Sequence, residues 1–248
     1  RDDGCYDLLA SEARLAVFIA IAKGDVPNTT WFRLGRQLVR ADGSPVMVSW
    51  SGSAFEYLMP LLVMRSFAGT LLDQSHRSAV RAQIAHGHEH DVPWGVSESA
   101  YNLRDKHLTY QYRAFGIPAL ALKRGLAREL VIAPYATALA ALVQPATAIR
   151  NLIELEAWGA LGTYGFWDAL DFTRPAPGKP FAMVQTVMAH HAGMTLVALT
   201  NVLHDEVWQR RFHAEAIVRA NELLLQERVP RKLVVQPALQ PPDDETQR

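Results

Sequence analysis

The chain has 248 residues, 49% of them hydrophobic, which suits one domain with a sizeable core and excludes wholesale disorder. Its 25 Lys and Arg residues balance 25 Asp and Glu residues, so no net field draws the chain to nucleic acid or to an anionic membrane. The single cysteine, Cys5, excludes an internal disulfide framework and fits a reducing compartment.

Short apolar segments at helical spacing predict eight or nine helices, joined by loops rich in Trp, Tyr and Gly. The expected helices cover residues 6–23, 70–85, 136–143, 146–158, 185–191, 193–204 and 206–227, with further helical segments after 53 and 119. Strand signals are few, and residues 164–172 favour a hairpin or rim loop. An all-α domain built of helix hairpins is expected, with its chemistry in the loops at one end.

Residues 130–149 carry no charge over 20 residues, close to the length that spans a bilayer. Because the segment contains Pro134, Gln144 and Pro145 and is rich in Ala, it is interpreted as a buried helix of a soluble domain. The chain begins at Arg1 without a secretory signal, and we interpret it as a segment of a longer protein.

One carboxylate, Glu98, lies between Trp94 and Tyr101 among small residues, and the nearest basic residue is Arg104. A carboxyl group held against apolar rings loses hydration, which raises its pKa and prepares it for proton transfer near neutral pH. Aromatic faces beside a carboxylate also suit a sugar ring, whose C–H face stacks while its hydroxyls need acceptors. The alternative is a surface loop whose Glu faces water.

Two further carboxylates have a structural explanation and a functional one. Ser53 and Glu56 have the spacing of a capping box at a helix start, which by itself explains Glu56. In the functional interpretation, Glu56 faces a cleft between Trp50 and Tyr57. Glu12 lies within the first expected helix, where spacing alone indicates a solvated position.

Three alternating histidines, His86, His88 and His90, follow the helix that we expect to end at Gly87. They are expected in a polar loop, where alternate residues do not share a side, and a transition-metal site needs further ligands and a dry shell. No metal and no cofactor are therefore expected. Nucleotide-binding, hydrolase-triad and zincin motifs are absent from the sequence.

Several segments, in order along the chain, together resemble the glycoamylase-like central domain of cyclic β-1,2-glucan synthases, which is related to endo-β-1,2-glucanases. The matching segments are CYDLLASEARL (5–15), residues 49–60, PWGVSESAYN (93–102), YQYRAFG (110–116), APYATAL (133–139), MAHH (188–191) and residues 222–231 with LLLQERVP. The resemblance implies an (α/α)6 toroid, with its N-terminal part expected outside this chain. Residues 1–231 would form the catalytic domain and residues 232–248 a linker or tail.

The resemblance also implies an activity and partners. The family's domain is understood to act on linear β-1,2-glucan and to transfer it onto its own end, closing a ring with retention at the anomeric carbon. It is expected beside a membrane glucosyltransferase and a phosphorylase-like region of one synthase, on the cytoplasmic side of the inner membrane, with this segment itself soluble and without nucleic-acid partners. Endo-hydrolysis of β-1,2-glucan, or glycan binding without catalysis, are the alternatives.

Carried over by position, Glu98 is expected as the nucleophile and Glu12 as the acid/base, acting directly or through a substrate hydroxyl or water. Glu56 is the alternative partner of Glu98. The expected substrate-binding residues are Tyr6, Asp7, Trp50, Tyr57, Trp94, Tyr101, Tyr110, Tyr112, His190 and His191.

Overall fold

The computed structural model describes residues 7–41 and 43–229, so Tyr6 and the expected tail at 232–248 lie outside the described residues. Helices dominate this part of the chain. The α-helices are α1 (Ala13–Ala22), α2 (Thr29–Arg33), α3 (Ala54–Leu58), α4 (Leu71–Glu89), α5 (Pro134–Ala140), α6 (Pro145–Ala157), α7 (Ala189–Leu203), α8 (Val207–Ala214) and α9 (Ala216–Arg219). The 3₁₀ helices are η1 (Met59–Leu62), η2 (Pro118–Leu120), η3 (Leu126–Arg128) and η4 (Glu222–Gln226).

Small antiparallel sheets accompany the helices, so the expectation of an all-α domain is correct only in its helix content. Two hairpins pair β1 (Leu38–Ala41) with β2 (Ser44–Met47) and β6 (Leu161–Gly162) with β7 (Gly165–Phe166). The other sheets pair β3 (Ser99–Arg104) with β4 (Tyr110–Arg113), and β5 (Val131–Ile132) with β8 (Ala169–Asp171) and β9 (Ala182–Val184). Strands of two to six residues are too short for a clear alternating pattern in the sequence.

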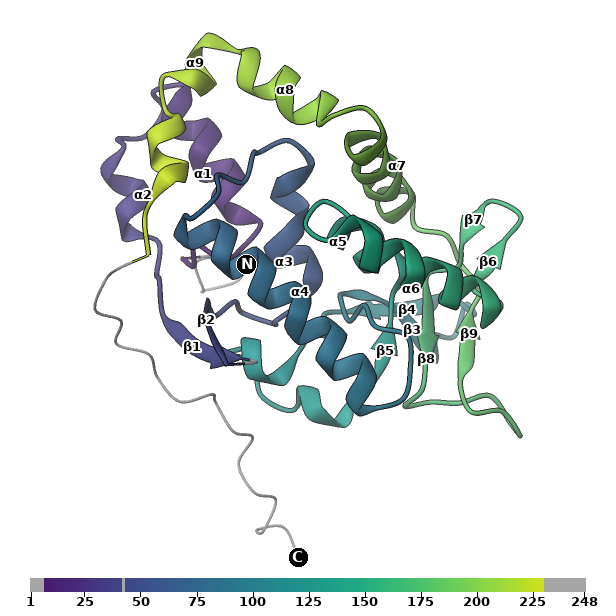
Figure 1. Cartoon of the computed structure of the whole chain (residues 1–248). Coiled ribbons are helices and arrows are strands. Elements are labelled where there is room, and N and C mark those ends of the chain that lie inside the picture. Colours follow the sequence, from purple (N-terminus) through teal and green to yellow (C-terminus); the bar gives the residue numbers. More distant parts are fainter. Residues whose placement is uncertain (1–6, 42, 230–248) are drawn as a thin grey trace, which may run out of the picture.

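The elements are arranged around a central group formed by α3, α4 and α5 (Figure 1). α7, α8 and α9 form an arch along one side, in which α7 packs on α5 and η1 and α9 reaches α1. All strands except the β1–β2 hairpin gather at one end (Figure 1). After the arch, the chain returns to α4 and α2, where Glu227 pairs with Arg36 at 2.7 Å.

Two helix boundaries differ from the sequence-based expectation, and both matter for function. α1 begins at Ala13, because Leu8 forms an extended bridge with Gly35, and this places Glu12 at the N-cap of the helix. α4 continues through Gly87 to Glu89. The glycine is explained by a close approach, since a Cβ atom there would lie 2.7 Å from the Cβ atom of Trp94.

Three other expectations concern later segments. α7 runs without a break through Gly193, and the helix expected from residue 119 is replaced by the short turns η2 and η3. α5 is wholly buried, so the interpretation of a buried helix is correct for this part of the uncharged segment, which also contains β5 and the partly exposed start of α6. None of the helices among the described residues has the length and apolar character needed to cross a bilayer.

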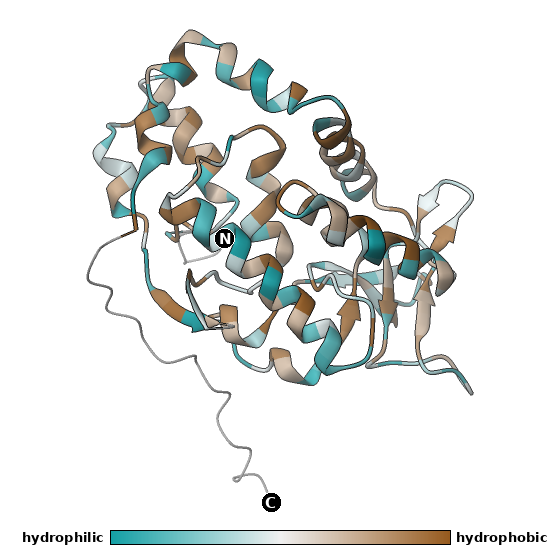
Figure 2. Ribbon diagram, viewed as in Figure 1, coloured by the Kyte–Doolittle hydropathy of each residue, from teal (hydrophilic) through white to brown (hydrophobic). Residues whose placement is uncertain are grey.

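The hydrophobic core continues through the central helices, but α7 is not fully covered. Figure 2 shows hydrophobic residues along much of α7. Its Met194 and Ala198 are buried, whereas Leu196 and Leu203 are 68% and 75% exposed. α7 therefore offers an apolar face to solvent on the side away from the core.

A buried cation joins the first helix to the centre of the molecule. The Arg14 guanidinium donates to the backbone oxygens of Ser11 and Glu56 at 3.0 Å and of Tyr57 at 2.6 Å, and lies 3.1 Å from Nε2 of His76. Burial lowers the pKa of Arg14 to about 9. The side chain thus links α1, α3 and α4 through bonds that replace its lost hydration.

We expect Arg14→Leu to lower the free energy of unfolding by about 3 kcal/mol or more, because it leaves three buried carbonyl oxygens without their donor. Urea denaturation measures this difference. Arg33→Leu, at an exposed position of α2, is the matched control and should change the free energy by less than about 0.5 kcal/mol. Equal effects of the two substitutions would contradict this role of Arg14.

Candidate active site

The segment of residues 93–98 is held by hydrogen bonds from several helices. Trp94 N–H donates to Oδ1 of Asn151 on α6 at 3.1 Å. The Gln83 side chain on α4 both accepts from Val96 N–H at 2.7 Å and donates to the Val96 carbonyl at 2.8 Å. Ala54 N–H, at the start of α3, donates to the same carbonyl. The carboxylate at the end of this segment is therefore presented by a fixed backbone.

The Glu98 side chain is one end of a chain of hydrogen bonds. The Tyr112 hydroxyl donates to Oε1 of Glu98 at 2.9 Å and lies 3.1 Å from Nε2 of His191. Nδ1 of His191 lies 2.6 Å from Oδ1 of Asp168, and Oδ2 of Asp168 accepts from Ala100 N–H at 2.7 Å. We call the series Asp168–His191–Tyr112–Glu98 the Glu98 relay.

The relay is enclosed on one side and open on the other. The ring of Tyr135 stacks on His191 with centroids 3.7 Å apart, and its hydroxyl donates to the Glu98 carbonyl at 2.9 Å. Asp168 and His191 are buried, whereas Tyr112 and His190 are exposed. Nε2 of His190 lies 3.4 Å from the Tyr112 hydroxyl. The relay thus runs from the protein interior to an accessible carboxylate.

Opposing effects set the protonation of Glu98. Burial raises the pKa of Glu98, while the hydrogen bond from Tyr112 and the field of His191 lower it. Burial and the Glu98 charge also raise the pKa of Tyr112, so its hydroxyl keeps its proton and acts as a donor. The relay therefore offsets part of the desolvation free energy that half-burial of the ionised Glu98 carboxylate costs.

Glu12 is a second half-buried carboxylate in the same electrostatic neighbourhood. Burial raises the pKa of Glu12, and the charges of Glu56 and Glu98 raise it further. Its Oε2 accepts from the Ser11 hydroxyl at 3.1 Å. A carboxyl group in this environment is favoured in its protonated, proton-donating form.

Glu56 differs from these two because its oxygens are occupied by the protein. The expected capping box is confirmed, with Ser53 accepting from Glu56 N–H and the Glu56 carboxylate accepting from Ser53 N–H. The hydroxyls of Ser49 and Ser51 donate to Oε2 at 2.9 and 2.6 Å, and Ser51 N–H donates as well. Only 5% of the residue is exposed.

Two loops, at residues 49–53 and 116–117, pack closely and hold the three serines that surround the Glu56 carboxylate. Ile117 N–H donates to the Gly52 carbonyl, and a Cβ atom on Gly116 would lie 1.8 Å from the Ser51 carbonyl oxygen. A side chain at position 116 would therefore force the loops apart. The close packing of the two loops therefore explains why the YQYRAFG segment has a glycine at position 116.

Three of the rings expected to bind sugar are packed in the core instead. Tyr57 is buried and its hydroxyl donates to the Met47 carbonyl at 2.6 Å. Trp94 is 5% exposed, and Tyr101 packs edge-on against Phe115. Burial of the large apolar surface of these rings stabilises the folded chain, and a buried ring has no face accessible to a ligand.

Most of the other expected binding residues that the structure describes remain accessible, whereas His191 is buried behind Tyr112. Trp50 is 38% exposed in the loop before α3, and Asp7 is exposed at the start of the described chain. Tyr110 is half-buried beneath the Arg104 guanidinium, 4.2 Å from the ring centroid. Tyr112 and His190, described above, complete the accessible set.

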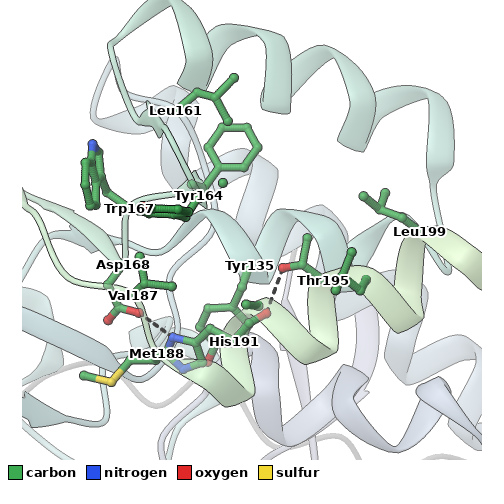
Figure 3. A pocket seen from close by; sticks show the side chains of 14 residues that line it. Tyr135, Leu161, Tyr164, Trp167, Asp168, Val187, Met188, His191, Thr195 and Leu199 are labelled. Atoms are coloured by element: carbon green, nitrogen blue, oxygen red, sulfur yellow. Dashed lines mark hydrogen bonds and ion pairs between the residues drawn. The ribbon is translucent and has the colours of Figure 1, made fainter.

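A pocket of about 290 Å³ lies beside the relay, between the β6–β7 hairpin and α7. In Figure 3 the rings of Tyr164 and Trp167 lie on one side of the pocket and the Asp168–His191 pair on the other. Tyr164 is 84% exposed, so its ring is free to stack on a ligand. The lining is mostly apolar with a few polar groups, which is typical of a ligand site.

Several residues of this site were missed in the sequence. Tyr135 lies in the APYATAL segment, which contributes to the family resemblance but for which no binding role is predicted, and Asp168 lies in an aromatic stretch interpreted only as a hairpin or rim loop. The aromatic run at 164–172 was a usable signal for Tyr164 and Trp167, because rings on a rim loop are available to ligands.

Comparison with known proteins places this geometry in a family. The Glycoamylase family model, described as "Putative glucoamylase", matches residues 5–215. The chain belongs to this family of glycoamylase-like domains.

The cyclic β-(1,2)-glucan synthase NdvB of Rhizobium meliloti (strain 1021) is 50% identical over 244 residues, which are 98% of this chain and 9% of that protein. The chain therefore spans a small part of its relative's length.

Solved structures share the fold at low sequence identity. An endo-β-1,2-glucanase from Chitinophaga pinensis, in complex with sophorotriose and glucose, gives a TM-score of 0.61 at 16% identity, covering 84% of this chain and 52% of that one. An endo-β-1,2-glucanase from Talaromyces funiculosus, in complex with sophorose, gives 0.58 at 17% identity, covering 95% and 53%.

We expect Tyr112→Phe to raise the pKa of Glu98, because it removes the hydroxyl that stabilises the ionised carboxylate. A ¹³C NMR titration of the glutamate side-chain carboxyl carbons measures this pKa. Tyr164→Phe, which removes an equivalent hydroxyl from an exposed ring, should leave it unchanged. An unchanged or lowered pKa in the Tyr112 variant would contradict the relay.

Proposed function

We propose that this chain is a catalytic domain that transglycosylates linear β-1,2-glucan and closes it into a ring, with Glu98 as nucleophile and Glu12 as acid/base. The observation that carries the proposal is the Glu98 relay, which stabilises an ionised carboxylate at an accessible position. The half-buried Glu12 with its raised pKa supplies the complementary proton donor. The 50% identity to a cyclic β-(1,2)-glucan synthase supports the choice of substrate.

The two carboxylates have environments that suit opposite roles. A nucleophile must be ionised, and Tyr112 donates to Glu98 while the His191 side chain lies behind it. An acid must carry a proton, and burial together with the charges of Glu56 and Glu98 raises the pKa of Glu12 by more than its backbone and Ser11 hydrogen bonds lower it. Pairs of carboxyls whose environments differ in this way are typical of glycoside chemistry.

A hydrogen-bonded path joins Glu98 to His191. The Tyr112 hydroxyl donates to Glu98 and lies 3.1 Å from Nε2 of His191, whose Nδ1 lies 2.6 Å from the Asp168 carboxylate. The hydrogen bond from Tyr112 and the field of His191 both lower the pKa of Glu98 and so favour its ionised form.

In the proposed reaction, a Glu98 oxygen bonds to the anomeric carbon while the glycosidic bond breaks. The leaving glucan oxygen takes the proton of Glu12, directly or through a hydroxyl or water. The 2-hydroxyl at the other end of the same glucan then attacks the anomeric carbon, loses its proton to Glu12, and releases Glu98. Two displacements retain the anomeric configuration.

Glu56 fits a supporting role in this scheme. Its carboxylate already accepts from Ser49, Ser51 and Ser53, and breaking those buried bonds to release it for catalysis would cost free energy. Its charge still raises the pKa of Glu12. Glu56 therefore favours the protonated acid without touching the substrate.

Endo-hydrolysis is the second candidate, favoured by the fold shared with two endo-β-1,2-glucanases. It differs in the final acceptor, which is water rather than a glucan hydroxyl. The products distinguish the two activities: cyclic glucan indicates transfer, and shortened linear chains indicate hydrolysis.

We expect Glu98→Gln and Glu12→Gln each to lower kcat on linear β-1,2-glucan by at least about 10³-fold, measured by product chromatography in the full-length protein. Glu156→Gln, at an exposed position of α6, is the matched control and should retain full activity. Activity within a few-fold of wild type in the Glu98 variant would reject the assignment. Binding of the glucan without turnover in the wild type would favour a non-catalytic module.

We expect Asp168→Asn to lower kcat by about 10²-fold and to move the acid limb of the pH–rate profile to higher pH. The amide no longer holds the His191 ring through a carboxylate, which weakens the field of His191 that lowers the pKa of Glu98, so Glu98 keeps its proton to a higher pH. Asp171→Asn, at the end of strand β8 and bonded to Asn102 N–H, tests for a merely structural effect. An acid limb that moves equally in both variants, or in neither, would contradict the relay mechanism.

A further inference from the structure

Three potential metal ligands lie side by side at the end of α4, and none of them belongs to the Glu98 relay. Because α4 continues through Gly87, His86, Glu89 and His90 are separated by three and four residues, the spacing that places side chains side by side on a helix. Their ligand atoms all lie within 4.8 Å of one another. The sequence-based expectation of a loop, in which His86 and His90 would diverge, is corrected by this longer helix.

The two imidazoles lie side by side. Nδ1 of His90 lies 2.9 Å from the backbone oxygen of His86, and the two ring centroids are 4.3 Å apart. A carbonyl that accepts from one ring nitrogen fixes the tautomer and leaves the other nitrogen, Nε2, free as a ligand. This is the outer-shell arrangement that supports histidine ligands in metal sites.

We propose that His86, Glu89 and His90 bind one divalent transition-metal ion, with Zn²⁺ as the reference cation. Two imidazoles and one carboxylate are ligands that Zn²⁺ accepts, and water would complete its coordination. Ligand atoms around a tetrahedral Zn²⁺ lie about 3.4 Å apart, so the side chains must close by at most about 1.4 Å. Glu89 and His90 are exposed and can move to do so.

The placement of the three side chains also suits a cation. His86 is partly buried, whereas Glu89 and His90 are exposed. Glu89 supplies one negative charge to offset the cation. His88, one residue before Glu89, belongs to another face of the helix and is not part of the group.

A bound ion would connect the last turn of α4 to the chain that follows it. Val92 N–H donates to the Gly87 carbonyl at 3.0 Å, and Gly87 packs directly against Trp94. The bound ion would therefore stabilise the C-terminal end of α4, after which the chain continues into the segment that carries Glu98. The site does not depend on the proposed glucan chemistry.

Isothermal titration calorimetry and thermal unfolding of the tag-free chain with ZnCl₂ test the proposal. We expect one site with a Kd of about 10 μM or tighter, and a Tm that rises with Zn²⁺ concentration. His90→Gln and Glu89→Gln should weaken binding by about tenfold or more. His88→Gln is the matched control, since it removes an exposed histidine from the same turn and should leave the affinity unchanged.

Two results would overturn the site. Binding weaker than about 1 mM in the wild type would show that the three side chains do not act together. Equal affinities for His88→Gln, His90→Gln and Glu89→Gln would show that Zn²⁺ binds elsewhere. Both changed ligands are exposed, so unaltered circular dichroism of the variants separates loss of binding from loss of folding.

Discussion

The Asp168 carboxylate is buried and therefore has to find hydrogen-bond donors within the protein. It accepts one hydrogen bond from the backbone of β3 and lies against His191 on α7, so a single carboxylate just before β8 holds a strand and a helix that are far apart in sequence. The stacking of Tyr135 on His191 adds α5 to this junction. The position of the Glu98 side chain depends on these contacts.

The features that could be predicted from the sequence are local ones. The capping box at Ser53 and Glu56 needs only four residues, and the structure has it as expected. Glu98 was singled out by its immediate neighbours, and its partner Tyr112 lies only 14 residues away on the adjacent strand. Local propensity and turn chemistry are sufficient for such features.

The parts that could not be predicted depend on contacts distant in sequence. Asp168 and Ala100 are 68 residues apart, and nothing near either residue indicates the other. Gly87 looked like a helix terminator, but its actual constraint is the approach of Trp94, which is visible only in three dimensions. The same holds for Tyr57 and Trp94, whose rings read as a sugar platform and instead fill the core. Tertiary packing overrides local preference at each of these positions.

The enclosure of Asp168 and His191 also determines how the site responds to its medium. Mobile ions screen exposed charges over a Debye length of about 8 Å at physiological ionic strength, but they penetrate little into a protein interior. The groups behind Tyr112 are buried, so their field acts on Glu98 through protein and not through solution. The contribution of these buried groups to the pKa of Glu98 is accordingly less sensitive to salt than the attraction within exposed pairs such as Lys23 and Asp25.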